Sequence, residues 1–385
     1  MTVTQNIARL NHLLRLYNLT SEELLSNVNE GLKKPIGKEE LFSSEIKLNY
    51  LKRIDKFFNK GLHYYIDPKA PNESKEASIF FRKHIFNSEL SLGAKKVVNH
   101  FEEFKISLSA IAKLANLKSS RFFQVYKISD NPRTVAGEIR ELIFPTFTID
   151  LKEFLKALIT RFAERNILVF EFVEYWNQKE KANIDGFFLN PNVIVLKRQQ
   201  SSFRREIFTL IHEFAHYLLN EEEIEKLEYQ NLAKKDLSAI EKWCNDFSYY
   251  FLAGAFAEEI DKIDLATPQN DYHHSYVERI SKSTHLSRIA IYTRLLYQNK
   301  ISQSYYENVK NDLEEQYQQK LLDAKKLKEQ EKELGIKSRG SAPQPIKSPL
   351  LISTIQTAFY EGVLSEYDVC KTLDIKPERF SEYIQ

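Results

Sequence analysis

The sequence predicts an α+β fold that is mostly helical, in which a small mixed β-sheet packs on two neighbouring helices between helical N- and C-terminal regions. Three observations predict this fold. The 385 residues include 26 Phe and 20 Tyr but only 10 Gly and 11 Pro, a balance that favours helices over Gly-rich all-β folds. Apolar residues recur at helical spacing along most of the chain. Two stretches, residues 166–176 and 185–196, are instead rich in β-branched and aromatic residues, as strands are.

Composition excludes several classes of protein. A hydrophobic content of 43% over this length is enough for two or three domains, and the net charge of +2 favours neither nucleic acid nor an acidic membrane as a partner. Cys244 and Cys370 are far apart and form no CxxC pair, which is typical of a reducing compartment. No secretion signal and no long apolar run occurs. We therefore expect a cytoplasmic protein that does not contact a membrane, and no feature indicates its oligomeric state.

Residues 1–131 are predicted to form a helical N-terminal region. Apolar periodicity predicts helices at residues 7–17 and 48–58, and Thr20 and Ser21 are candidate N-caps before the next apolar run. Residues 105–123 have the pattern of two short helices around a turn at Asn116. Such a pair is compatible with a helix-turn-helix, although any small helical domain contains similar pairs, so DNA contact here is doubtful.

The predicted central domain, residues 132–300, begins after the Asp-Asn-Pro break at residues 130–132. Its expected elements are a helix at 151–165, a strand at 166–176, two short strands around an Asn-Pro-Asn turn at 185–196, and helices at 207–218, 237–256 and 287–301. Residues 301–349 are predicted to be a charged, solvated helix followed by a linker rich in Pro, Ser and Gly. Residues 350–385 are predicted to be a small helical C-terminal unit.

The motif His-Glu-Phe-Ala-His at residues 212–216 carries the strongest chemical signal. His212 and His216 are four residues apart, so a helix places both imidazoles on one face, where they can reach one ion. Glu213 is offset around the helix and is placed to act as a general base towards water at that ion. The competing interpretation is an ordinary helix with two histidines. Burying two polar rings in an apolar helix costs free energy unless a partner satisfies them, and a metal ion is such a partner.

A zinc peptidase needs a third protein ligand, for which two candidates exist. The acidic run Glu221, Glu222 and Glu223 is near in sequence, but no glycine turns the chain back, and this run is more typical of a solvated helix end. Glu241 lies on the following helix, after a connection long enough to bring the two helices side by side. One turn later, Asn245 could accept a hydrogen bond from the second ring nitrogen of a ligand histidine. Asp246 is the alternative for that role.

The motif HEFAH, followed after a spacer by IEKWCNDF, resembles the ImmA/IrrE family of metallopeptidases, which is gluzincin-like. The stretches NPRTVAGEIREL and IDGFFLNPNVIVLKRQ are similar to the first helix and the strand pair of that peptidase domain, so the resemblance spans residues 132–296. It implies zinc ligands at His212, His216 and Glu241 and a catalytic acid at Glu213. The sequence YYFLAGAF departs from the Leu-Met-Pro ending of many relatives, which affects the wall of the cleft rather than the ligands.

The resemblance also implies a function and a partner. Relatives often begin with an XRE-type helix-turn-helix, and residues 19–25 and 51–61 are similar to its first and last helices, whereas residues 26–47 do not resemble a recognition helix. The implied activity is zinc-dependent cleavage of a helix-turn-helix repressor in a response to DNA damage, phage or another stress. The alternative is a non-catalytic regulator, or a repressor-binding, antitoxin-like protein, with a structural metal site. A digestive protease is disfavoured because no secretion signal occurs.

The expected mechanism assigns roles to few side chains. Zinc lowers the pKa of water and polarises the scissile carbonyl, while Glu213 transfers the proton to the leaving amine. Tyr249 and Tyr250 are candidate oxyanion donors, although packing is the more usual role for each. An exposed strand within residues 186–196 could pair with an extended substrate.

Overall fold

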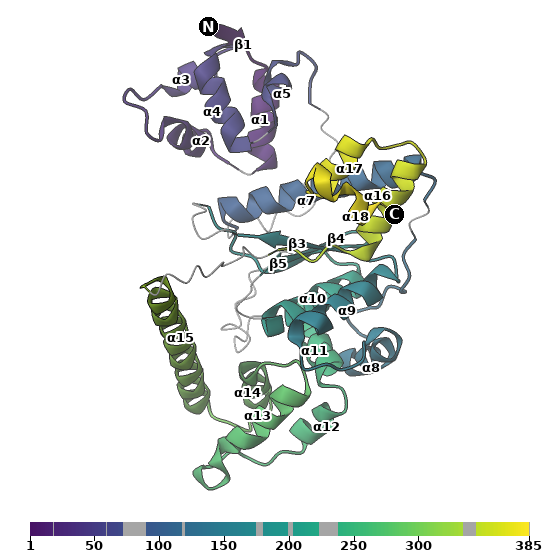
Figure 1. Ribbon diagram of the computed structural model, residues 1–385. Helices are drawn as coiled ribbons and strands as arrows, with labels where there is room; N and C mark the ends of the chain where they lie inside the picture. The colour runs from purple at the N-terminus through teal and green to yellow at the C-terminus, as the bar shows by residue number, and fades with distance from the viewer. Residues whose placement is uncertain are drawn as a thin grey trace. The chain divides into compact units, whose positions relative to one another are not determined.

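The computed structural model describes residues 1–17, 19–58, 60–71, 90–117, 120–174, 180–198, 203–222, 238–333 and 344–384 (Figure 1). The chain divides into two compact units. The first is Met1–Phe104 together with Glu180–Asn183, and the second is Lys105–Lys179 together with Ile184–Gln385. The domain limits at residues 131, 300 and 349 stay predictions.

The first unit contains five helices and a two-stranded antiparallel sheet among its described residues up to position 71. Thr20 caps α2 as expected, in a reciprocal capping box with Glu23. Residues 26–47, where a recognition helix would lie, contain the end of α2, the single turn α3 and a strand, so a helix-turn-helix is not confirmed. The elements are β1 (Thr2–Thr4), α1 (Ile7–Leu16), α2 (Ser21–Asn29), α3 (Lys38–Leu41), β2 (Glu45–Lys47), α4 (Leu48–Phe58) and α5 (Leu62–Ile66).

The predicted pair of short helices around Asn116 is wrong. Residues Leu92–Leu114 form one continuous helix, α7, and the described residues 120–131 contain no helix. Asn116 has φ 54°, a left-handed conformation that ends a helix. The following segment is instead fixed by the second unit, because Phe123 joins its core and the Tyr126 N–H donates to the Leu218 carbonyl at 2.9 Å.

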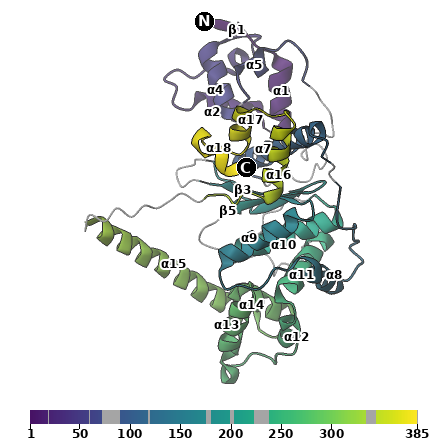
Figure 2. The same ribbon diagram turned by 45° about the vertical axis from the view of Figure 1, so that its right-hand side comes forward.

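The second unit is built on a three-stranded mixed sheet in the order β3-β5-β4. The strands are β3 (Leu168–Val173), β4 (Gly186–Leu189) and β5 (Val193–Arg198), with β3 parallel and β4 antiparallel to the central β5. The Asn-Pro-Asn turn joins β4 to β5 as predicted, with a cis bond between Asn190 and Pro191. Two helices, α9 (Leu151–Ala163) and α10 (Phe203–Leu219), lie together on one side of this sheet in both views (Figures 1 and 2).

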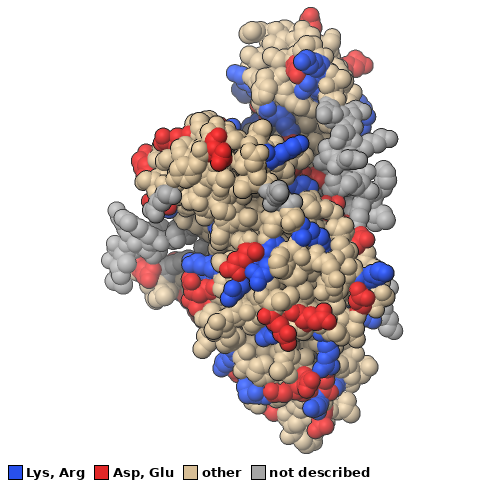
Figure 3. Space-filling model, turned by 90° about the vertical axis from the view of Figure 1, so that its right-hand side faces the viewer, with Lys and Arg blue, Asp and Glu red and all other residues tan. Residues whose placement is uncertain are grey.

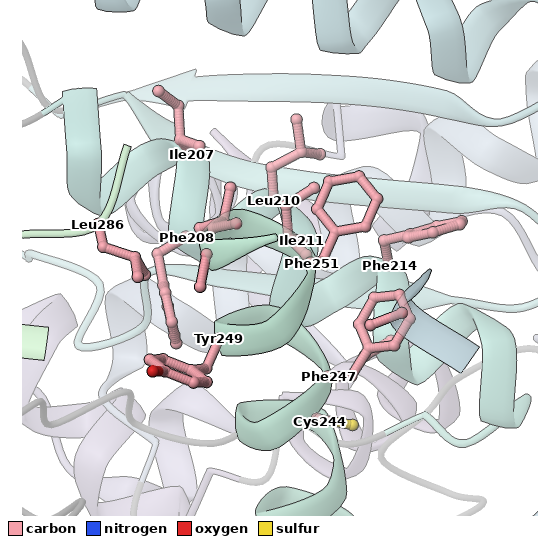
Figure 4. Packing of buried hydrophobic residues seen from close by; sticks show 14 of the residues in the cluster. Ile207, Phe208, Leu210, Ile211, Phe214, Cys244, Phe247, Tyr249, Phe251 and Leu286 are labelled. Carbon is pink, nitrogen blue, oxygen red and sulfur yellow. The ribbon is translucent and has the colours of Figure 1, made fainter. Parts of the chain in front are cut away.

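The core of the second unit forms around α10. Every residue from Glu206 to Leu219 is buried, since α10 lies between the sheet and the helices α8 (Pro132–Ile143) and α11 (Ala239–Ala253). Aromatic side chains fill the space between α10 and α11, where the rings of Phe214 and Phe247 lie 6.1 Å apart (Figure 4). The sheet and both helices of the predicted fold are therefore confirmed.

The remaining helices lie C-terminal to this core. The long helix after residue 301 is exposed over most of its length, and residues beyond 348 are helical, both as predicted. Among the described residues, none of the helices combines the length and the apolar character that crossing a bilayer requires. The elements are α12 (Phe256–Asp261), the 3-10 turn η2 (Pro268–His273), α13 (His274–Ser283), α14 (Arg288–Tyr297), α15 (Gln303–Glu333), α16 (Pro349–Tyr360), α17 (Glu366–Thr372), η3 (Pro377–Arg379) and α18 (Phe380–Tyr383).

Surface charge is mixed. Over the lower part of the face in Figure 3, basic and acidic side chains are interspersed rather than gathered by sign. That part of the face therefore offers no continuous basic surface to a nucleic acid.

Candidate metal centre

The two histidines of the motif lie on α10 with their imidazoles together. His212 and His216 are each 1% exposed, and their Nε2 atoms are 3.2 Å apart. The spacing of four residues along α10 places them one turn apart on the same face, as predicted. The two rings are therefore buried side by side inside the core of the second unit.

The third member of the site comes from the first turn of α11. Ser238 caps this helix and accepts a hydrogen bond from the Glu241 N–H at 3.1 Å, which fixes where the turn begins. The Glu241 carboxylate is 2% exposed and lies 3.2 Å from His212 Nε2 and 3.1 Å from His216 Nε2. The structure thus brings together the three predicted ligands from two helices.

The spacing of these atoms fits a metal ion. Zinc–nitrogen bonds of about 2.0–2.1 Å at a tetrahedral angle separate two ligand atoms by about 3.3 Å. The two Nε2 atoms are 3.2 Å apart, His212 Nε2 lies 3.2 Å from Glu241 Oε2, and His216 Nε2 lies 3.1 Å from the other oxygen, Oε1. One ligand atom from each of His212, His216 and Glu241 lies within 4.8 Å of the other two, so these three residues could hold a metal ion. Two imidazoles and one carboxylate are a donor set that suits zinc and leaves a fourth position open.

Electrostatics differ between the two buried glutamates. The pKa of Glu213 is raised to about 8, chiefly by burial; the charge of His212 opposes the rise, whereas the negative charges of Glu241 and Asp185 contribute to it. Burial would also raise the pKa of Glu241, but the two imidazoles hold it well below its ordinary value. The Glu241 carboxylate is therefore charged, and Glu213 is poised to hold a proton. A cation bound beside Glu213 would lower its pKa, because the positive charge stabilises the carboxylate.

Glu213 is held by the sheet on one side only. The backbone N–H of Phe188, in β4, donates a hydrogen bond to its carboxylate. Its other oxygen, Oε2, is buried and accepts no hydrogen bond within the described part of the chain. A buried acceptor without a partner costs free energy, and beside a metal site it fits a role in accepting a proton from water.

A glycine in β4, which the sequence analysis did not single out, lets the strand approach α10. A Cβ at Gly186 would lie 2.7 Å from Thr209 Cγ2, 3.0 Å from the Val195 carbonyl oxygen and 3.1 Å from Glu213 Cγ. The neighbouring Asp185 accepts a hydrogen bond from Arg205 Nε of α10 at 3.0 Å. A glycine inside a predicted strand is the one sequence signal that points to such a close approach.

Other predicted site residues lie apart from the ligand group. Asn245 Oδ1 is buried and accepts no hydrogen bond from the described residues, so its bond to a ligand histidine stays a prediction. Its rival Asp246 pairs with Arg294 at 2.9 Å, and Arg294 also donates to the Tyr250 hydroxyl at 2.5 Å. The Tyr249 ring belongs to the buried core. An oxyanion role for either tyrosine stays a prediction, and these contacts support packing.

Within the rival acidic run, Glu222 is engaged away from the histidines. Glu222 Oε1 accepts a hydrogen bond from the Asn190 N–H, in the turn between β4 and β5, at 2.7 Å. Glu223 lies outside the described residues. The described geometry therefore favours Glu241 as the third ligand.

Comparison with known protein families shows what the segment around this site is similar to. Residues 164–296 match the model of a peptidase family described as the IrrE N-terminal-like domain. No curated protein and no solved structure gives a significant match to the chain. The matched segment covers α10 and α11, with both histidines, Glu213 and Glu241. Residues 164–296 are thus similar to the IrrE N-terminal-like domain of a peptidase family, within the span where the sequence resembles ImmA/IrrE metallopeptidases.

Proposed function

We propose that this protein is a zinc-dependent endopeptidase that acts in the cytoplasm and cuts a helix-turn-helix repressor in a stress, DNA-damage or phage response. The observation that carries the enzymatic part is the triangle of His212, His216 and Glu241 with the buried Glu213 beside it. The repressor as substrate follows from the resemblance to ImmA/IrrE peptidases alone.

The residues of the chain have separable roles in this proposal. His212 and His216 of α10 and Glu241 of α11 would hold zinc, which when bound supplies a Lewis acid and lowers the pKa of water. Glu213 Oε2 accepts a proton from the attacking water and returns it to the leaving amine nitrogen. Burial raises the pKa of Glu213, which stabilises the carboxyl once it has taken up the proton and so favours the second half of that task.

The expected partner of an extended substrate is β4. This strand is at the edge of the described sheet, and its Phe188 N–H donates to the carboxylate of Glu213. All four residues of β4 are buried, so a peptide could pair with the outer edge of β4 only if the residues that cover it moved. Because backbone pairing carries little sequence information, the choice of substrate would depend on docking to other surfaces of the protein.

One experiment tests the enzymatic claim. The wild type and Glu213→Gln, both loaded with zinc, are incubated with a helix-turn-helix repressor encoded by a neighbouring gene. Glu213→Gln should retain zinc at the wild-type stoichiometry and lose roughly 10²–10⁴-fold in cleavage rate, because only the proton carrier is removed. Glu138→Gln, the same change at an exposed glutamate of α8, is the control and should cleave normally. Cleavage by Glu213→Gln at the wild-type rate would refute the mechanism and favour the non-catalytic alternative.

A further inference from the structure

The short segment before β4 belongs to the N-terminal unit. Residues Glu180–Asn183 group with Met1–Phe104 by their contacts, although the chain on either side of them belongs to the second unit. The segment meets the beginning of α7, which is also part of the N-terminal unit. We use "the α7–loop contact" for the interactions of Ser91, Gly93 and Lys96 with residues 180–183.

Polar groups fix the α7–loop contact in detail. The Ser91 N–H donates to Asn183 Oδ1 at 2.9 Å, and the Ser91 hydroxyl donates to the Lys181 carbonyl at 2.8 Å. The Asn183 N–H in turn donates to Ser91 Oγ at 3.3 Å. Lys96 Nζ pairs with Glu180 Oε2 at 2.7 Å. Two of these bonds use backbone atoms of the segment, so they hold its main chain and not only its side chains.

A helical glycine brings the two backbones together. A Cβ at Gly93 would lie 2.6 Å from the Lys181 carbonyl carbon and 2.7 Å from the carbonyl oxygens of Glu180 and Lys181. These are backbone atoms and cannot rotate away, so no other residue type fits without displacing the segment. Glycine inside a helix costs about 1 kcal/mol relative to alanine. The close approach of the two backbones explains why a glycine occupies this helical position.

Only two residues separate the α7–loop contact from the strand beside the metal site. Ile184 is buried. Asp185 makes two hydrogen bonds: its backbone carbonyl accepts from the Lys197 N–H at 2.7 Å, and its carboxylate accepts from Arg205 of α10. Gly186 follows directly and packs on Glu213 and Thr209. A displacement of residues 180–183 would therefore also displace β4, because only the two hydrogen-bonded or buried residues 184 and 185 connect them.

We propose that the α7–loop contact positions β4, and through the Phe188 N–H the carboxylate of Glu213, and that it thereby controls the reactivity of the candidate metal centre. Ser91 and Gly93 are then positioning residues for Glu213. The effect on catalysis rests on the proposed peptidase function, whereas the effect on β4 does not.

Hydrogen exchange of the full-length protein tests the effect on β4. Gly93→Ala places a Cβ against the Lys181 backbone, whereas Gly137→Ala is a matched control, because Gly137 is also helical and has nothing within 4 Å of its added Cβ. Gly93→Ala should speed amide exchange at residues 184–189 by about tenfold or more, and Gly137→Ala should leave it unchanged. Unchanged exchange at 184–189 in a folded Gly93→Ala protein would overturn the proposal.

A milder variant keeps the test decisive if Gly93→Ala does not fold. Asn183→Ala removes the acceptor of the Ser91 N–H without adding atoms and should also speed exchange at residues 184–189. In the repressor cleavage assay, Gly93→Ala and Asn183→Ala should lower kcat while zinc stoichiometry stays the same. Faster exchange with an unchanged kcat would overturn the positioning role. A wild type that does not cleave would instead refute the proposed function, and the exchange rates would then decide the link to β4 alone.

Discussion

Replacing Gly186 by alanine tests the contact between β4 and the helix that carries both histidines. The new Cβ would lie 2.7 Å from Thr209 Cγ2 and 3.0 Å from the Val195 carbonyl oxygen, and real Cβ atoms essentially never come closer than 3.0 Å. The Val195 oxygen is backbone of the paired strand β5, and Thr209 lies on the buried α10. Neither neighbour can move far, so β4 and α10 must separate.

The expected cost follows from that crowding. Overpacking a close-packed core costs about 1–3 kcal/mol. In a unit of this size, 1 kcal/mol corresponds to roughly 2–4 °C in Tm, so Gly186→Ala should lower Tm by about 2–12 °C. The third neighbour, Glu213 Cγ at 3.1 Å, predicts a second effect, a loss of cleavage beyond the loss of folded protein.

Calorimetry of the metal-free protein measures the first effect. Gly137→Ala is again the control, since its Cβ meets nothing within 4 Å and alanine favours a helix by about 1 kcal/mol over glycine. We expect the control to keep or raise Tm. If Gly186→Ala melted within about 1 °C of the wild type, the close packing of β4 on α10 would be refuted.

Two further predictions concern buried charge. Burial, and then the charges of Arg204 and Arg140, lower the pKa of His285 to about 4, so between about pH 6.5 and 4 the unfolded chain binds a proton that the folded chain does not. The free energy of unfolding should therefore fall as pH drops through that window. In melts at a series of pH values, His285→Phe should show a smaller decrease in Tm with falling pH than the wild type. Parallel plots of Tm against pH for the two proteins would contradict the prediction. Arg198 of β5 pairs with Glu206 and lies 3.7 Å from Glu171, and all three side chains are nearly inaccessible. Arg198→Met removes the positive charge beside these two buried carboxyl groups and should cost about 3–5 kcal/mol in urea unfolding. Replacing both glutamates by glutamine as well should recover most of that loss, and a triple variant no more stable than Arg198→Met would refute the network.

Local patterns predicted the helices and the common face of the two candidate histidine ligands well, because both depend on spacing within one element. The four-residue interval between His212 and His216 determines their common face once the segment is helical. Glu241 required one further step, a connection long enough to return the chain, and the structure confirms that it lies beside both rings.

Contacts between distant segments were not predictable in the same way. The second helix expected after Asn116 does not form, because residues near Phe123 and Tyr126 bind the core and the end of α10 instead. The three-residue strands β1 and β2 pair across more than forty residues and are too short to carry a periodic signal. The roles of Gly93 and Gly186 depend on which backbone passes beside them, and a single sequence does not contain that information.

Anomalous X-ray scattering at the zinc edge, from a crystal grown with zinc, tests the central claim most directly. The account predicts one strong peak at about 2.0–2.2 Å from His212 Nε2, His216 Nε2 and one Glu241 carboxylate oxygen. A crystal with no peak between the two imidazoles, or with the Glu241 side chain turned away from them, would contradict it.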